Sequence, residues 1–324
     1  MDSSQVLVVG GTGYLGSQVI AALLDRGKQV RALVRPGSDA GRLEAAGVAI
    51  ARGDMMDPGS LERAVGDVDA VVTTAAGYTG HSRGDTSEID VVGNRNLIDS
   101  AAQAGVRRFV LTSILTCDQT PQVPHFWHKK LAEDRLEDKH VAFVALRPGA
   151  FLDQLTRFGG DPFSRGSLSW LGSPRVPLTF ILTSDLAAYL AAAVDADIAA
   201  GERIDIGWDR PVSIQDVADI SGSLLGRPIT VAPGPTGGPG APDDGVSVPP
   251  DMAAMLEWFE TGRYVANTTR QGEVFNIPTA EDAIERFTSG PAGTARSTPA
   301  STWLRETGTR ESSRLSSANS STRR

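Results

Sequence analysis

A cluster of glycines near the start of the chain is its most specific sequence motif. It follows a β-branched apolar stretch at 5–10 and precedes an amphipathic stretch at 14–26. Glycines at such a turn let backbone N–H groups approach a pyrophosphate, and the helix N-terminus favours negative charge. We therefore predict a dinucleotide site, with a ligand-free tight turn as the alternative. The motif consists of Gly10, Gly11, Thr12, Gly13, Tyr14, Leu15 and Gly16, and it satisfies both Gly-x-Gly-x-x-Gly and Gly-x-x-Gly-x-x-Gly.

Arg35 stands at the expected end of the second strand, about 20 residues after the glycines, where an NAD site carries an acidic residue. A guanidinium there can pair with the 2′-phosphate of NADP and offers little to a ribose diol, so NADP(H) is the predicted cofactor. Ser38 and Arg42 can add contacts or start a solvated helix. Asp54 and Met55, after the third strand, suit the adenine edge, with a capping role for Asp54 as the alternative.

Six strand-like segments alternate with helical ones in the first half of the chain. The predicted strands are 5–10, 29–35, 48–54, 70–74, 107–113 and 141–147, and the predicted helices are 14–26, 60–65, 88–104 and 129–138. This rhythm is typical of parallel strands joined by crossover helices. The fold class predicted is α/β, a doubly wound parallel sheet of the Rossmann type with a smaller, mixed C-terminal region.

The pattern changes after Pro148. Helices are expected at 183–195, 213–225 and 251–261, and strands at 203–207 and 229–232, one of which can return to the sheet. The Pro- and Gly-rich stretch 233–250 is a connector or a lid. The predicted division is 1–150 for NAD(P) binding, 151–290 for covering the substrate, and 291–324 for a disordered tail rich in Ser, Thr and Arg.

Composition excludes several classes of protein. The net charge of −8 argues against nucleic-acid binding through a broad basic face, and no apolar run is long enough to span a membrane. Cys117 is the only cysteine, which rules out intramolecular disulfides and cysteine-based zinc sites and favours a reducing cytoplasm. The acidic start lacks the basic segment of a signal peptide. We expect a cytoplasmic protein with neither a nucleic-acid nor a membrane partner.

The first half of the chain resembles the atypical short-chain dehydrogenase/reductases of the NmrA-like and isoflavone-reductase-like group. The matching stretches are VLVVGGTGYLG at 6–16, VRALVR at 30–35, GVAIARGDMMD at 47–57, DVDAVV at 67–72, NLIDSAAQAGVRRFVLTS at 96–113 and LRPGAF at 146–151. The resemblance implies that Gly10, Gly13 and Gly16 hold the pyrophosphate and Arg35 the 2′-phosphate. It further implies that the segment Ala75, Ala76 and Gly77 lies along the cofactor.

The catalytic pattern departs from that of most short-chain reductases, which use a Tyr-x-x-x-Lys pair, because no tyrosine lies between Tyr78 and Tyr189. By resemblance, Lys129 in Lys129-x-x-x-Glu133 is the ribose anchor and a possible general acid. Ser113 resembles the serine that binds the substrate carbonyl. His125 occupies the place of the tyrosine, and imidazole has a suitable intrinsic pKa for proton donation.

Two other kinds of site are disfavoured. His125 and His128 have the proximity of metal ligands, but no carboxylate or cysteine lies at ligand spacing, so no metal is expected. No Gly-x-Ser-x-Gly elbow supports a hydrolase.

Two functions from different classes remain. The first is an NADPH-dependent reductase of a small, apolar carbonyl, enone or quinone. The second is a non-catalytic NADP(H) sensor that binds a partner protein, which the missing tyrosine favours. Retention of Lys129, Glu133 and Ser113 favours the enzyme. An epimerase of the extended branch also lacks its tyrosine here.

Overall fold

A seven-stranded parallel sheet organises the chain. The computed structural model describes residues 4–77, 86–154, 160–234 and 250–290. In these parts the strand order is β10-β6-β5-β4-β1-β2-β3, and every pair is parallel. The order reverses between β1 and β4, which makes a switch point there. The strands are β1 Gln5–Val9, β2 Gln29–Val34, β3 Ala49–Arg52, β4 Ala70–Thr73, β5 Arg108–Thr112, β6 Phe143–Pro148 and β10 Glu202–Ile206.

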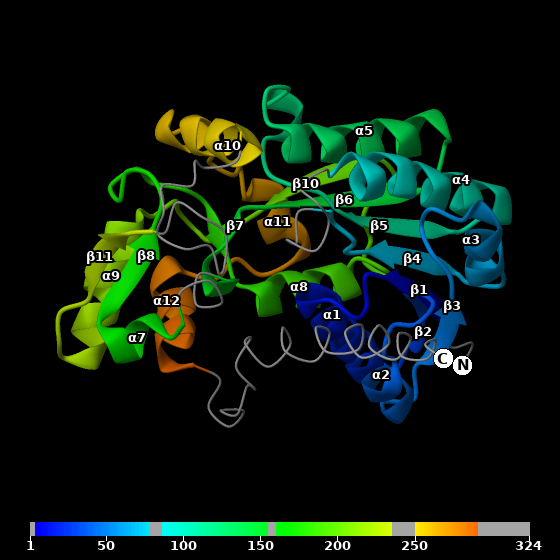
Figure 1. Cartoon of the computed structure of the whole chain (residues 1–324), viewed down its shortest axis with the longest axis horizontal. Coiled ribbons are helices and arrows are strands. Elements are labelled where there is room, and N and C mark those ends of the chain that lie inside the picture. Colours follow the sequence, from blue (N-terminus) through cyan, green and yellow to red (C-terminus); the bar gives the residue numbers. More distant parts are fainter. Residues whose placement is uncertain (1–3, 78–85, 155–159, 235–249, 291–324) are drawn as a thin grey trace, which may run out of the picture. The chain divides into compact units, whose positions relative to one another are not determined.

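Helices cover both faces of this sheet (Figure 1). One face carries α1 (Tyr14–Asp25) and α8 (Thr183–Ala192), and the other carries α3 (Pro58–Val65), α4 (Asn94–Ala104) and α5 (Pro124–Asp138). The residues of β1 alternate between the two resulting cores, Val6 and Val8 in one and Leu7 and Val9 in the other. A strand buried on both faces reads as a continuous apolar run, as β1 does from Val6 to Val9. The predicted Rossmann-type α/β class is confirmed.

The region after β6 adds one strand to the sheet and two small sheets beside it. β10 pairs with β6, while β7 (Ala150–Phe151) pairs with β9 (Phe180–Ile181), and β8 (Ser167–Trp170) pairs with β11 (Thr230–Pro233). The remaining helices are α2 Gly41–Ala45, α7 Pro162–Arg165, α9 Ile214–Leu225, α10 Pro250–Glu260, α11 Thr269–Val274 and α12 Ala280–Ser289.

One predicted helix start is five residues too late and one predicted helix begins with a different helix type, while the other predicted starts lie within two residues of the observed ones. α5 begins at Pro124 and not at residue 129, because proline is well suited to the first helical position, so Lys129 lies in the second turn. The helix expected at 88–104 begins as a π-helix, η1 (Glu88–Gly93), and continues as α4. Such π segments are often found at functional sites. α4 ends at Gly105 in the left-handed conformation, and the side chain of Ser213 caps the start of α9.

The described residues up to Thr288 belong to one compact unit. The predicted tail 291–324 lies outside the described residues, as does most of the loop predicted at 233–250. Among the described helices none is both long and apolar enough to cross a membrane.

Candidate functional site

The glycine motif forms the turn between β1 and α1, at the carboxyl edge of the sheet. Gly10 has a φ of +87°, which favours glycine. A Cβ on Gly16 would lie 2.1 Å from the carbonyl oxygen of Gly10, so the helix can approach the turn only without a side chain there. Thr74, after β4, donates its hydroxyl to the same carbonyl at 3.4 Å. The motif is therefore tied to the neighbouring strand of the switch point.

The N-terminus of α1 has the features of an anion site. Its N-cap is Gly13, which supplies no side-chain hydrogen bond, and its first turn carries no acidic residue. Thr12, Gly13 and Tyr14 are exposed. Four N–H groups at a helix start lack partners within the helix, and they suit a phosphate. The residues present thus fit a pyrophosphate, as the spacing predicts.

The loop after β2 carries Arg35, which is exposed. Arg52, the last residue of β3, donates its guanidinium to the carbonyl oxygens of Ser38 at 2.6 Å and Arg35 at 3.4 Å. A second arginine therefore holds the backbone of the loop that presents the first. Arg52 was not predicted as a site residue, because only the parallel register of β2 and β3, which pairs Val34 with Arg52, brings it to this loop.

Asp54 and Met55 lie at the same edge, after β3. The Asp54 carboxylate accepts the backbone N–H of Met56 at 2.9 Å, which is a local turn contact akin to the alternative predicted for it. Met55 is 6% exposed and packs against Gly93 of η1. Their adenine contact remains a prediction.

Lys129 is clamped between η1 and the end of β4. Its ammonium donates to Asp90 Oδ1 at 2.6 Å and to the carbonyl of Ala75 at 3.1 Å. Asp90, 1% exposed, also accepts the backbone N–H of Gly77 at 2.7 Å. The structure thereby brings Lys129 to the predicted cofactor segment 75–77. A lysine has three N–H donors, and these contacts use two of them.

His125 and His128 take different partners, so they do not form a common metal site. His125 Nδ1 lies 2.7 Å from Asp251 Oδ1, and His128 Nδ1 lies 2.8 Å from Thr86 Oγ1. Across the described ranges, no group of three or more metal-ligating residues occurs. Asp251 was missed by sequence reasoning because it lies 126 residues from His125, at the start of α10.

Ser113 belongs to a second buried network, which joins α5 to β6 and β10. Its hydroxyl donates to Glu133 Oε1 at 2.6 Å, and the fully buried Glu133 also accepts from Arg147 at 2.6 Å and Arg203 at 2.9 Å. Burial and the nearby Glu133 carboxylate raise the pKa of the Cys117 thiol to about 12. Burial lowers the pKa of Arg147, but the hydrogen bonds with Glu133 and Asp118 and the nearby negative charges together outweigh burial and raise it. The substrate role of Ser113 remains a prediction.

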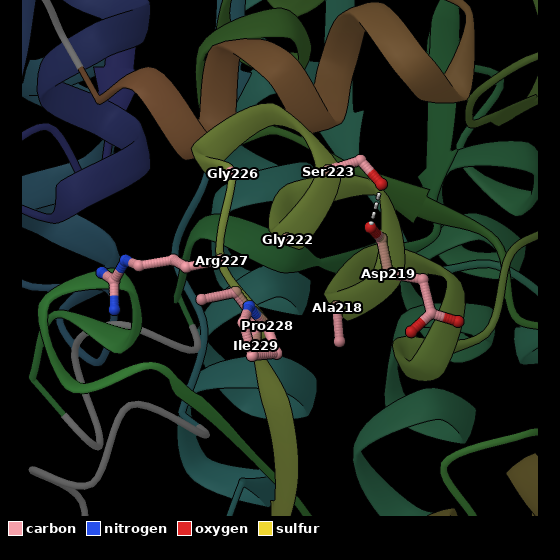
Figure 2. A pocket seen from close by; sticks show the side chains of 8 residues that line it. All are labelled: Ala218, Asp219, Gly222, Ser223, Gly226, Arg227, Pro228 and Ile229. Carbon is pink, nitrogen blue, oxygen red and sulfur yellow. Dashed lines mark hydrogen bonds between the residues drawn. The ribbon is translucent and has the colours of Figure 1, made fainter.

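The surface also has a hollow away from these residues. It measures about 530 Å³ and lies between α9 and the turn into β11 (Figure 2). Its lining includes Gly222, Gly226 and Pro228, and the Arg227 side chain extends out of it toward the carbonyl of Phe163. None of the predicted site residues lines this hollow.

Comparisons with known proteins agree with this geometry. The curated relatives include photosystem II assembly factor Ycf39 of Synechocystis sp., 28% identical over 69% of this chain and 68% of the relative. They also include 2-alkyl-3-oxoalkanoate reductase of Stenotrophomonas maltophilia, 30% identical over 69% and 76%, and NAD(P)H azoreductase of Xenophilus azovorans, 27% identical over 69% and 75%.

Solved structures show the same fold. Triphenylmethane reductase of Citrobacter sp. with NADP(H) has a TM-score of 0.71 at 18% identity, covering 87% of this chain and 99% of that one. NADPH-dependent quinone oxidoreductase of Escherichia coli with NADPH has a TM-score of 0.70 at 20% identity, with the same coverage. The NmrA-like family model matches residues 2–268, and with the glycine turn at the switch point it shows that this chain belongs to the NmrA-like family.

Proposed function

We propose that the protein is an NADPH-dependent reductase of a small, apolar carbonyl, enone or quinone. Relatives named as reductases of an oxoalkanoate and of azo compounds support hydride chemistry in this family. Similar folds include proteins crystallised with NADP(H) or NADPH. When bound, the reduced nicotinamide supplies a hydride to the acceptor.

The chain's own residues fit such a cofactor from end to end. The open N-terminus of α1 takes the pyrophosphate at Gly10, Gly13 and Gly16. Arg35, on the loop that Arg52 holds, takes the 2′-phosphate as a planar donor. The backbone of Ala75 to Gly77 continues from the neighbouring strand β4 toward Lys129.

The observation that carries the proposal is the clamp on Lys129. A buried carboxylate, Asp90, and the Ala75 carbonyl fix the ammonium at the carboxyl edge of β4, next to β1 and the glycine turn. The third N–H of Lys129 is then available for the nicotinamide ribose. We assign Lys129 to binding and orienting the cofactor and Ser113 to contacting the substrate oxygen. Glu133, on the same helix as Lys129, ties α5 to Ser113 and to Arg147 of β6.

The experiment is oxidation of NADPH and, in parallel, NADH with a panel of quinones, enones and ketones. We expect turnover with NADPH. Lys129→Met should lower kcat/KM about 10- to 100-fold, since a hydrogen bond to a charged group contributes about 1.5–3 kcal/mol. Lys130→Met is the matched control, because Lys130 pairs with Asp134 on the surface of the same helix. Equal activity of the Lys129→Met variant and the wild type would contradict the assignment.

The sensor function is the second candidate. The absent tyrosine favours it, and some relatives are named as assembly factors of photosystem II and not as reductases. Saturable NADPH binding without reduction of any acceptor would support a sensor with a protein partner. For either function we propose a cytoplasmic location, because the single cysteine, Cys117, is a buried free thiol, which fits a reducing compartment.

A further inference from the structure

We propose that His125 and Asp251 form a proton-donating dyad that replaces the tyrosine of the Tyr-x-x-x-Lys pair. His125 is the catalytic residue and Asp251 its positioning residue. This inference deepens the proposed function and rests on it. It selects between the two proton donors that the sequence leaves open, Lys129 and His125.

The dyad is assembled by two helices. His125 lies in the first turn of α5, one turn before Lys129, and residues four apart share a helix face. Asp251 lies in the first turn of α10, and its Oδ1 is 2.7 Å from His125 Nδ1. The side chains are 8% and 20% exposed. A carboxylate only accepts hydrogen bonds, so Nδ1 carries the hydrogen and Nε2 is the nitrogen that exchanges the proton.

Packing holds the two helices in place. The Phe126 ring meets the imidazole of His125 edge-on, with 4.7 Å between ring centroids, and lies 6.5 Å from the ring of Phe259 on α10. Trp258, also on α10, donates its indole N–H to Thr116 Oγ1 at 3.0 Å, in the loop before α5. Groups held on packed helices keep the geometry that proton transfer needs.

The charges favour His125 over Lys129 as the donor. A proton leaving Lys129 would leave the carboxylate of Asp90, 1% exposed, without a cation and almost without solvent, which is costly, whereas the carboxylate of Asp251 is 20% exposed and can be solvated. A proton leaving His125 Nε2 leaves a neutral imidazole that still donates Nδ1–H to Asp251. The dyad can therefore lose its proton and keep its contact.

The step balances as follows. For a ketone, the carbonyl carbon would gain the hydride that the bound reduced nicotinamide supplies, and the carbonyl oxygen would gain the proton of His125 Nε2. For a quinone, one carbonyl oxygen would gain the hydride and the other the proton. The electron pair of the N–H bond stays on Nε2, so that the products are neutral imidazole, the alcohol or the hydroquinone, and the oxidised nicotinamide. Solvent then returns a proton to Nε2.

The first test measures the histidine tautomer by NMR of the whole chain. The chain has four histidines, so labelling their ring nitrogens with ¹⁵N gives few signals, and His125→Gln identifies the one concerned. We expect the neutral His125 ring to carry its hydrogen on Nδ1 and to move toward the Nε2–H form in Asp251→Asn. Glu257→Gln, which changes an exposed carboxylate of α10, should leave it unchanged. An Nε2–H ring in the wild type, or no change in Asp251→Asn, would overturn the dyad.

The second test separates kcat from cofactor binding. General acids contribute about 10²- to 10⁴-fold, so we expect kcat to fall about 100-fold in His125→Gln and at least about tenfold in Asp251→Asn. The Kd for NADPH should stay within about twofold in both. If His125→Gln does not fold, Asp251→Asn, which keeps the imidazole, decides alone. Unchanged kcat, or a Kd that rises as kcat falls, would refute the dyad, whereas a wild type without turnover would refute the proposed function.

Discussion

Replacing Asp90 by asparagine tests the clamp on Lys129 through the stability of the fold. Asp90 is 1% exposed, and the change leaves the ammonium of Lys129 without its anion. Loss of one partner of a buried ion pair costs about 3–5 kcal/mol. Asparagine keeps an oxygen for the N–H of Gly77, so we expect the lower end, about 3 kcal/mol. For a unit of this size that lowers Tm by roughly 6–12 °C.

The assay is urea unfolding in a double-mutant cycle. Asp90→Asn, Lys129→Met and the double variant are compared with the wild type, and the double variant should be more stable than the sum of the single losses predicts, by about 2 kcal/mol or more. Asp134→Asn is the matched control, because it removes the carboxylate from a Lys–Asp pair on the surface of α5. It should cost at most about 1 kcal/mol.

Additive losses would refute this reasoning, because they mean that Asp90 and Lys129 do not stabilise each other. A loss in Asp90→Asn no larger than in Asp134→Asn would refute it as well. In either case the ion pair with Asp90 would not fix Lys129, and the inference that Lys129 lies beside the cofactor would no longer be supported.

Three further variants test other parts of the site. Arg35→Ala should raise the Kd for NADPH about 10- to 100-fold and leave that for NADH nearly unchanged in titration calorimetry; equal effects would contradict 2′-phosphate recognition. Gly16→Ala, whose Cβ would lie 2.1 Å from the Gly10 carbonyl, should cost about 1–3 kcal/mol in thermal unfolding. Gly59→Ala is the control, because a Cβ on Gly59 would lie 3.5 Å from its nearest atom, Asp57 Oδ1, and it should cost far less stability. Equal losses of stability in the two variants would count against the tight turn at Gly16. The pKa of Cys117 is raised from its ordinary 9.0 to about 12, so the folded thiol keeps a proton that the unfolded thiol loses. Stability should therefore fall by about 1.4 kcal/mol per pH unit between those values, and by less in Cys117→Ala, whereas parallel urea curves for the two proteins would contradict it.

The fold could be predicted because its signals are local. An apolar strand, a glycine turn and an amphipathic helix follow one another at 5–26, and Gly105 and Gly226 end their helices in the left-handed conformation. The predicted start of α5, residue 129, was wrong. Charged residues around Lys129 obscure the apolar face of the helix, and Pro124, which favours the first helical position, was the better signal for its start.

The candidate site was predicted only in part, because its partners are distant in the sequence. Lys129 was indicated by the family resemblance, but Asp90 lies 39 residues before it, and nothing local marks that carboxylate as its counter-charge. Asp251 follows a Pro-rich stretch and contacts His125 only through the packing of α10. Ser113 has the residue type and place expected of a substrate contact, while its hydroxyl is bound to Glu133.

Transfer of deuterium from NADPH tests the central claim most directly. NADPH labelled at C4 on one face or the other is incubated with the protein and the acceptor panel, and the products are analysed by mass spectrometry. We expect the cofactor to lose its label from one face only, with one deuterium on the reduced carbon when the acceptor is a ketone or an enone. Deuterium passed to a quinone oxygen exchanges with solvent, so for quinones the label is followed in the oxidised cofactor. Saturated binding of NADPH with no loss of label from the cofactor would contradict a reductase and would favour the sensor.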